Sequence, residues 1–188
     1  MLKSVVVAMS VVLTLASAGY GLSFDDVQVE YWTGEGANSA MMIVDFGQDA
    51  ANFAFGYKWN GEACSYDMIG AIADAGLLDA AFTYHPVYLH GLDSLSYSGY
   101  TMYTDWVEKY CFVGAWASTD GESWQPHATG ICGRLLSDGD WDGYTLEDAT
   151  ISEWPLNLPV VPQHVPEPTT VSLLLISAAG LFLKRRSH

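Results

Sequence analysis

Apolar and polar residues alternate in the part of the chain that follows residue 23. Residues 27–32 alternate with a period of two, and residues 41–46 and 53–59 form two further apolar segments. Alternation places successive side chains on opposite faces of a strand, so these segments predict three strands. The third segment runs directly into Asn60-Gly61, a dipeptide typical of tight turns.

The period changes after residue 64. Four apolar residues recur there at helical spacing: Met68, Ile69, Ile72 and Ala73. They predict a helix over residues 68–75 that packs on the sheet through Met68 and Ile72. Ser65 is a suitable N-cap, although Cys64 or Asp67 could mark the boundary equally well. Gly76 is expected to end the helix, because glycine readily adopts the left-handed conformation that follows a last turn.

Strand-like segments return after this helix, at residues 83–89, at Gly91-Leu92 and on both sides of the turn 119–121. A final strand is expected to begin at about Trp141. This order predicts one α+β domain over residues 23–151, with a mainly antiparallel sheet and one principal helix. From Glu153 onward a proline recurs every three or four residues, which predicts an extended linker over residues 153–164.

The first 18 residues have the pattern of a secretory signal peptide. Lys3 precedes an apolar run at residues 5–15, and Ala16-Ser17-Ala18 supplies the small residues of a cleavage site. Cleavage is expected after Ala18, with a cut after Gly21 as the alternative. The mature chain is therefore expected outside the cytoplasm, exported by Sec-type machinery.

The last 24 residues contain an extended motif, a short apolar stretch and a basic end. The motif is Pro166-Glu167-Pro168, residues 171–183 carry no charge, and Lys184, Arg185 and Arg186 follow. A helix over the apolar stretch would be roughly 20 Å long, against about 30 Å of hydrocarbon in a bilayer. The bases are expected to stay on the cytoplasmic side, which places the preceding chain across the membrane.

Residues 165–188 resemble bacterial PEP-CTERM sorting signals, which have the same three parts in this order at the C-terminus. The resemblance implies that an exosortase, a membrane transpeptidase-like enzyme, recognises the motif and removes the tail. It also implies a precursor tethered to the inner membrane, and then a location at the cell surface or in the extracellular matrix of a Gram-negative-type bacterium. The alternative is a C-terminal anchor that is never cut.

The body between these two signals is strongly acidic. It contains 21 of the 22 acidic residues but only three basic ones, Lys58, Lys109 and Arg134, which gives a net charge of −18 with histidine neutral. Such a surface repels phosphate groups, so nucleic-acid binding is excluded. An acidic surface instead favours the binding of divalent cations.

Asp138, Asp140 and Asp142 occupy alternate positions in Asp-Gly-Asp-Trp-Asp-Gly, a sequence that fits the opening of a calcium-binding loop. If calcium binds, these three carboxylates are the expected ligands, and no other cofactor is indicated. A twelve-residue loop of this kind closes with glutamate, whereas Ala149 occupies that position here. An acidic turn that leads into a strand is therefore the preferred interpretation.

Three cysteines, Cys64, Cys111 and Cys132, lie in the body. Export to an oxidising compartment favours one disulfide and one free thiol. Cys111 and Cys132 would face each other on two strands around the turn 119–121. This pair is therefore the predicted disulfide, which would stabilise the domain by about 3 kcal/mol if it is unstrained. Cys64 is expected to be free and mostly buried.

Seven tryptophans and eleven tyrosines are more than usual for a chain of this length. Flat rings beside carboxylates suit sugar-binding surfaces, because ring faces stack on sugars while polar groups bind the hydroxyls. Trp124 and Trp141, which both lie next to turns, are the candidate ligand-binding residues. Packing of the aromatic residues in the core and on the sheet is the preferred alternative.

Catalytic patterns are weak in this sequence. Gly-Glu-Ser-Trp-Gln at residues 121–125 lacks the final glycine of a hydrolase elbow. His85 and His90 have a spacing that suits neither a metal pair on a helix nor one face of a strand. Carboxylate pairs are unavoidable in so acidic a chain and carry little information. The protein is therefore predicted not to be an enzyme.

Several pieces of the body occur in a recognisable order: residues 67–72, Gly91-Leu92, Trp116 with Asp120-Gly121, and residues 135–140. They resemble the transcobalamin C-terminal-like β-grasp domains of exported bacterial proteins, in which a helix packs on a curved sheet that sometimes binds a corrinoid. The leading hypothesis is a non-catalytic exported protein of the cell surface or the exopolysaccharide matrix. A small-ligand or glycan-binding module and an unrecognised hydrolase are the alternatives.

Overall fold

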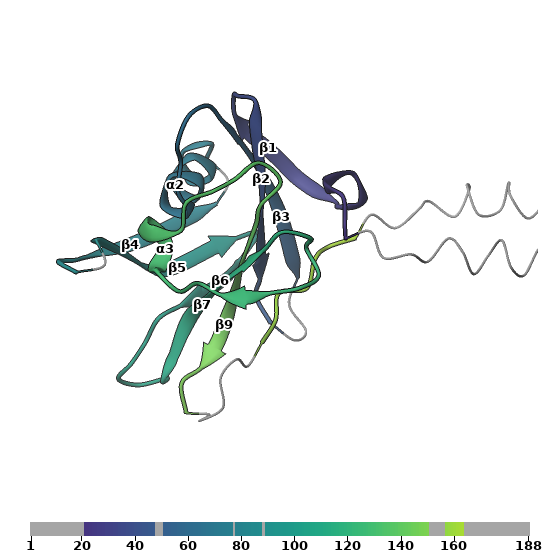
Figure 1. Cartoon of the computed structure of the whole chain (residues 1–188). Helices are drawn as coiled ribbons and strands as arrows, with labels where there is room; N and C mark the ends of the chain where they lie inside the picture. The colour runs from purple at the N-terminus through teal and green to yellow at the C-terminus, as the bar shows by residue number, and fades with distance from the viewer. Residues whose placement is uncertain (1–20, 48–50, 77, 88, 151–156, 164–188) are drawn as a thin grey trace, which may run out of the picture.

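The computed structural model describes residues 21–47, 51–76, 78–87, 89–150 and 157–163 (Figure 1). The elements within these ranges are, in chain order, η1 Phe24–Asp26, β1 Val29–Gly34, β2 Asn38–Asp45, β3 Asn52–Trp59, α2 Ser65–Asp74, β4 Asp79–His85, β5 Leu89–Tyr97, β6 Tyr100–Tyr103, β7 Cys111–Ser118, β8 Gln125–Pro126, α3 Gly130–Gly133 and β9 Trp141–Asp148.

The strands of the described residues form two sheets. The larger sheet has six strands in the order β1-β3-β2-β9-β7-β8, and the smaller one has the order β4-β5-β6. β1 pairs with β3 and β2 pairs with β9 in parallel, whereas the other neighbours run antiparallel. The predicted α+β class, dominated by sheet and with one main helix, is confirmed.

The helix α2 lies where the apolar spacing predicts it. Met68 and Ile72 are fully buried against the larger sheet. The N-cap is Cys64, whose backbone N–H donates to the Asp67 carboxylate at 2.9 Å. The chain turns out of the helix at Gly76, which has a φ of +95° that suits glycine. Cys64 and Asp67 therefore cap the N-terminus of the helix together, whereas Ser65 is the first residue of the helix.

The larger sheet is the middle layer of the domain. Its first face packs against α2 and the smaller sheet, through residues that include Met42, Phe55 and Tyr144. The opposite face carries Met41, Trp116 and Trp141, and it is covered by coil from both ends of the described chain. Alternate residues of β2 and β9 thus enter two different cores, as the pleat of a strand requires.

Aromatic side chains join the two sheets. Phe53 and Phe55 on β3 contact Tyr97 on β5, with ring centroids 4.7 and 5.0 Å apart and edge-to-face geometry. This is the arrangement that aromatic quadrupoles favour. For these residues the preferred alternative, packing in the core and on the sheet, is confirmed.

Two predicted strands are wrong. Residues 83–89 do not form one strand, because β4 ends at His85, a turn follows at residues 86–87, and β5 begins at Leu89. The second cysteine-bearing strand shrinks to the two residues of β8, after which the chain enters the short helix α3. Residues 83–85 and Gly91-Leu92 do lie in strands, β4 and β5, but β6 and the pairing of these three strands in a separate sheet were not predicted.

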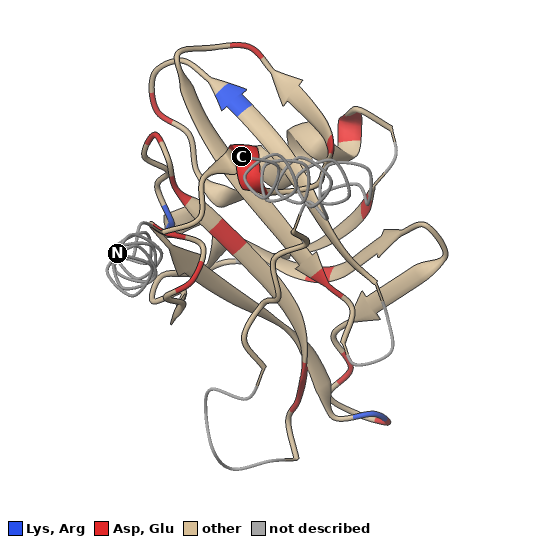
Figure 2. Cartoon of the chain, turned by 90° about the vertical axis from the view of Figure 1, so that its right-hand side faces the viewer, with Lys and Arg blue, Asp and Glu red and all other residues tan. Residues whose placement is uncertain are grey.

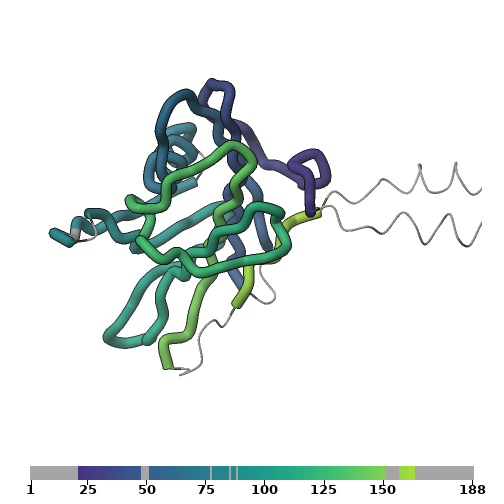
Figure 3. The backbone as a smooth tube through the Cα atoms, viewed as in Figure 1, coloured from purple at the N-terminus to yellow at the C-terminus, as the bar shows by residue number. Residues whose placement is uncertain are grey.

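The predicted linker is in part a structured piece of the domain. Residues 157–163, here called the C-terminal strap, lie along the larger sheet (Figure 3). The Val160 N–H donates to the Asp45 carboxylate at 3.0 Å, and the Asn52 amide donates to the Val160 carbonyl at 2.7 Å. Pro159 is buried over Gly143, which leaves no room there for a Cβ. The domain therefore extends past residue 151, because the strap covers apolar surface that would otherwise face water.

Candidate functional site

Trp124 and Trp141, the predicted ligand-binding residues, are core residues. Their exposed fractions are 7% and 2%. The Trp141 ring meets Phe24 edge to face, with centroids 4.8 Å apart, and Trp124 packs on Gly143 beside the strap. The prediction of an exposed platform at these two residues is wrong, because the N-terminal segment and the strap cover the face on which they lie.

The three predicted calcium ligands are engaged with protein partners. Asp138 accepts a hydrogen bond of 2.8 Å from the Ser39 N–H, and the Arg134 guanidinium lies 3.0 Å from Asp140 and 3.3 Å from Asp142. No group of three or more His, Cys, Asp or Glu placed to hold a metal ion occurs in the part of the chain that the structure describes. An arginine therefore supplies the positive charge at this motif, and residues 138–140 form an acidic turn that leads into β9.

Asp142 is the centre of a buried polar network. It is fully buried, accepts a hydrogen bond from the Ser65 hydroxyl, and lies 3.5 Å from both the Tyr144 hydroxyl and His127 Nε2. Burial and the nearby Asp142 carboxylate raise the pKa of Tyr144 well above its usual range. The network links α2, β9 and the segment around Arg134, so it fixes how these elements pack.

This network does not have the geometry of a serine hydrolase. A catalytic serine donates its proton to the imidazole, and the carboxylate orients that imidazole from the other side. Here the Ser65 hydroxyl donates to the Asp142 carboxylate, and His127 Nε2 lies 3.0 Å from the Trp116 carbonyl oxygen. All three polar side chains are enclosed, so the cluster serves the packing of the domain.

All three cysteines fall within the described residues, and all are free thiols. The predicted pairing assumed that Cys111 and Cys132 face each other across a hairpin. In the structure Cys111 pairs with Asp148 across β7 and β9, whereas Cys132 lies in α3. That assumption is wrong, because the chain leaves the sheet after β8. Burial raises the pKa of the Cys64 thiol.

The predicted sorting elements lie outside the described residues. These are the signal peptide at residues 1–18, the motif Pro166-Glu167-Pro168, and the basic end Lys184, Arg185 and Arg186. Among the residues that are described, no helix has the length and apolar character needed to span a bilayer.

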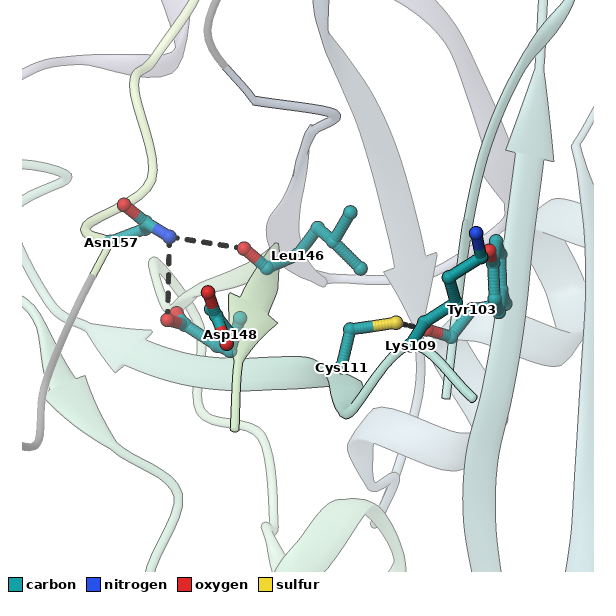
Figure 4. A pocket seen from close by; sticks show the side chains of 7 residues that line it. Tyr103, Lys109, Cys111, Leu146, Asp148 and Asn157 are labelled. Carbon is teal, nitrogen blue, oxygen red and sulfur yellow. Dashed lines mark hydrogen bonds between the residues drawn. The ribbon is translucent and has the colours of Figure 1, made fainter. Parts of the chain in front are cut away.

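An open pocket of about 330 Å³ lies at one end of the larger sheet, where β7 begins and β9 ends (Figure 4). Its wall consists of side chains from β6, β7, β9, the following loops and the strap: Tyr103, Lys109, Cys111, Leu146, Glu147, Asp148 and Asn157. The Asn157 amide donates to the Leu146 carbonyl at 3.0 Å and to a Glu147 carboxylate oxygen at 3.4 Å. The strap thus completes one side of the pocket.

Glu147 is a buried carboxyl at the base of this wall. It accepts a hydrogen bond of 2.6 Å from the Thr145 hydroxyl, which in turn accepts from the Trp116 indole N–H at 2.8 Å. Burial raises the pKa of Glu147, while these hydrogen bonds oppose the shift. The pocket wall therefore combines polar donors and acceptors, among them the Lys109 ammonium and the Asn157 amide, with the carboxyl groups of Glu147 and Asp148.

A short projecting loop borders the pocket. Residues 105–111, here called the aromatic loop, are closed by two hydrogen bonds between the backbones of Asp105 and Cys111, at 2.7 and 2.9 Å. Three apolar side chains of this loop are exposed: Trp106 at 59%, Val107 at 78% and Tyr110 at 52%. The Trp106 ring stacks on Phe112 with centroids 5.3 Å apart and planes 12° apart, so the indole is held in place while one face points outward.

The aromatic loop was not predicted from the sequence. Asp105, Trp106 and Val107 follow no hydrophobic period. The only local signal of a turn is Asp105 itself, because aspartate side chains often accept hydrogen bonds from the backbone N–H groups that follow them. In the structure the Asp105 carboxylate accepts from the Val107 and Glu108 N–H groups, both at 2.9 Å. This turn brings tryptophan and tyrosine to the surface, whereas the tryptophans chosen from the sequence are buried.

The aromatic loop is expected to loosen in acid. Hydrogen bonds from the Glu108 and Val107 N–H groups lower the pKa of Asp105 in the folded protein. The Asp105 carboxylate therefore stabilises the loop fully above the pKa of an unfolded aspartate, about 4. This stabilisation is lost as the pH falls through the lower pKa of the folded state. Amide exchange of Val107 and Glu108, corrected for its intrinsic pH dependence, should accelerate in that range. Asp105→Asn keeps an acceptor that cannot titrate, so equal acceleration in this variant would contradict the assignment.

Comparison with known proteins gives no relative: no family model, no curated protein and no solved structure matches this chain.

Proposed function

We propose that this is an exported, non-catalytic protein that a PEP-CTERM signal sorts to the cell surface or the exopolysaccharide matrix of a Gram-negative-type bacterium. Sec-type machinery would export the precursor, and an exosortase-like enzyme would process its tail. The proposal is supported by a signal-peptide pattern at residues 1–18 and by the motif, apolar stretch and basic end of residues 165–188. The acidic domain is then the part that functions outside the cell.

One structural observation supports the proposal: the first and last segments of the domain lie next to each other. Val27 and Gln163 form an antiparallel bridge, and the Gln28 N–H donates to the Pro162 carbonyl at 3.0 Å. The two ends of the domain therefore lie side by side, while the β4-β5 turn lies at the opposite end (Figures 1 and 3). A precursor held in a membrane through either end would present the same far surface to the outside.

The charge of the domain fits this location. Acidic positions are spread over strands and loops of the described residues, and basic positions are few (Figure 2). Such a surface keeps the domain soluble and away from anionic lipid headgroups. A hydrated polysaccharide matrix imposes no such repulsion if its chains are neutral.

We further propose that the body is a β-grasp domain. Within the larger sheet, β2 and β9 run parallel in the middle, β3 pairs outside β2, β7 and β8 lie outside β9, and α2 follows β3. A helix held by two hairpins whose first and last strands are parallel neighbours is the arrangement of that fold. β1 adds a parallel strand at the outer side of β3.

The sorting proposal predicts that Glu167→Ala abolishes processing. Glu167 is the charged residue between two prolines of the motif, so its loss should leave full-length precursor in the inner membrane while the domain folds normally. Intact-mass analysis of protein from a host that has an exosortase measures this. Glu153→Ala, which changes an acid in the proline-rich segment outside the motif, is the matched control and should be processed fully.

Two results would overturn the sorting proposal. One is a mature wild-type mass that still includes Arg185 and Arg186. The other is a Glu167→Ala protein whose mass and location equal those of the wild type. A host that lacks the exosortase should accumulate the same precursor as the Glu167→Ala variant.

A further inference from the structure

The aromatic loop and the pocket beside it form one continuous surface. Tyr103 at the end of β6 and Lys109 within the loop both line the pocket, and the Cys111 thiol lies 3.5 Å from the Tyr103 carbonyl oxygen (Figure 4). Trp106 stacks on Phe112, which pairs across the strands with Glu147 of the pocket wall. Exposed rings therefore stand next to a concavity that contains polar groups.

The loop is built to hold its rings in position. Asp105 binds two backbone N–H groups of the loop, and the Ala149 N–H donates to the Tyr110 carbonyl at 2.6 Å. Tyr110 adopts a φ of +51°, a conformation that most residues avoid. The loop exposes large apolar side chains to water, and exposed apolar surfaces of this kind commonly bind a partner.

The polar groups identify the chemistry of that partner. The Lys109 ammonium supplies donors, and the side-chain oxygens of Asp148 and Asn157 supply acceptors. Asp105, Glu108, Glu147 and Asp148 outnumber the single base, so an anionic ligand would be repelled. A neutral ligand with apolar faces and many hydroxyl groups satisfies both the rings and the polar groups.

We infer that the aromatic loop and the adjoining pocket bind a neutral polysaccharide, with Trp106 stacking on a sugar ring and Lys109, Asp148 and Asn157 binding its hydroxyl groups. The inference rests on the proposed matrix role and names the partner in that role. It differs from the platform predicted from sequence, because it uses none of the buried tryptophans. Insertion of the loop into a membrane fits less well, since anionic headgroups would meet the same acidic side chains.

Affinity electrophoresis tests the inference. The full chain, purified in mild detergent, should be retarded in gels that contain a neutral glucan or galactomannan, and Trp106→Ala should weaken this binding roughly tenfold or more. Trp106→Phe keeps a ring on Phe112 and should retain most of the binding. Tyr84→Ala removes a ring that is 65% exposed on β4 and should bind like the wild type.

The outcomes separate this inference from the sorting proposal, because binding in vitro does not depend on processing. Absence of retardation by the neutral polymers, equal retardation of wild type and Trp106→Ala, or stronger binding to an anionic polymer such as alginate would each overturn the inference. Trp106-dependent binding to phosphatidylglycerol vesicles without polysaccharide binding would also overturn it and assign the loop to membranes. Circular dichroism and thermal unfolding of each variant show whether a loss of binding reflects a loss of fold.

Discussion

Arg134→Met is expected to destabilise the domain by about 3–5 kcal/mol, because it leaves two buried carboxylates, Asp140 and Asp142, without their counter-charge. The Arg134 side chain is 22% exposed, whereas Asp142 is fully buried. Methionine retains an apolar stem of similar length, so the loss of stability measures the contribution of the guanidinium and its contacts with Asp140 and Asp142. Urea unfolding followed by tryptophan fluorescence measures the change in the free energy of unfolding.

Two further variants identify the cause of this loss. Lys58→Met removes the same charge at an exposed position where the ammonium lies 5.3 Å from the centre of the Trp32 ring, so it should change stability by less than about 1 kcal/mol. Arg134→Met combined with Asp142→Asn removes the more deeply buried of the two unpaired charges and should recover part of the loss, while Asp140 stays unpaired. A small effect of Arg134→Met alone, or no recovery in the double variant, would mean that Asp142 does not need this partner.

The parts of the fold that were predicted correctly depend on local patterns. The β1, β3 and α2 segments have regular periods that place most of their large apolar side chains on one face, whereas β2 was predicted from an apolar run and is buried on both faces. Met68 and Ile72 entered the core because helical spacing puts both on one face. The turn at Gly61 and the helix end at Gly76 both use a positive φ that glycine adopts without steric strain.

The errors come from contacts between residues that are far apart in the chain. Trp141 lies next to a turn, and nothing in its neighbourhood shows that Phe24 covers it. Likewise, the strap reaches Asp45 across more than one hundred residues, although a run of prolines is typical of a free linker. Local sequence can predict an element, but it does not show which distant segment completes its burial.

The acidic motif illustrates the same limit for the site. Alternating aspartates suit calcium, and a sequence pattern does not reveal that Arg134 occupies the space between two of them. Arg134 is the only arginine in the body and precedes the motif by a few residues, which was the available signal. For the aromatic loop no comparable signal exists, because exposure of Trp106 follows from the turn at Asp105 and the stacking on Phe112.

The extent of the domain can be decided by truncation. A chain that ends after Gln163 should fold with the stability of the full protein. A chain that ends after residue 151 should be less stable by about 3 kcal/mol or more. The shorter chain lacks the buried Pro159 and the hydrogen bonds that the strap makes with Asp45 and Asn52. Thermal and urea unfolding of the two purified proteins measure the difference. Leu158→Ser, which changes a strap side chain that is 52% exposed, is the control and should have little effect. Equal stability of the two truncated chains would show that the strap is dispensable. Failure of the chain ending after Gln163 to fold would show that the tail is part of the domain and more than a separate sorting signal.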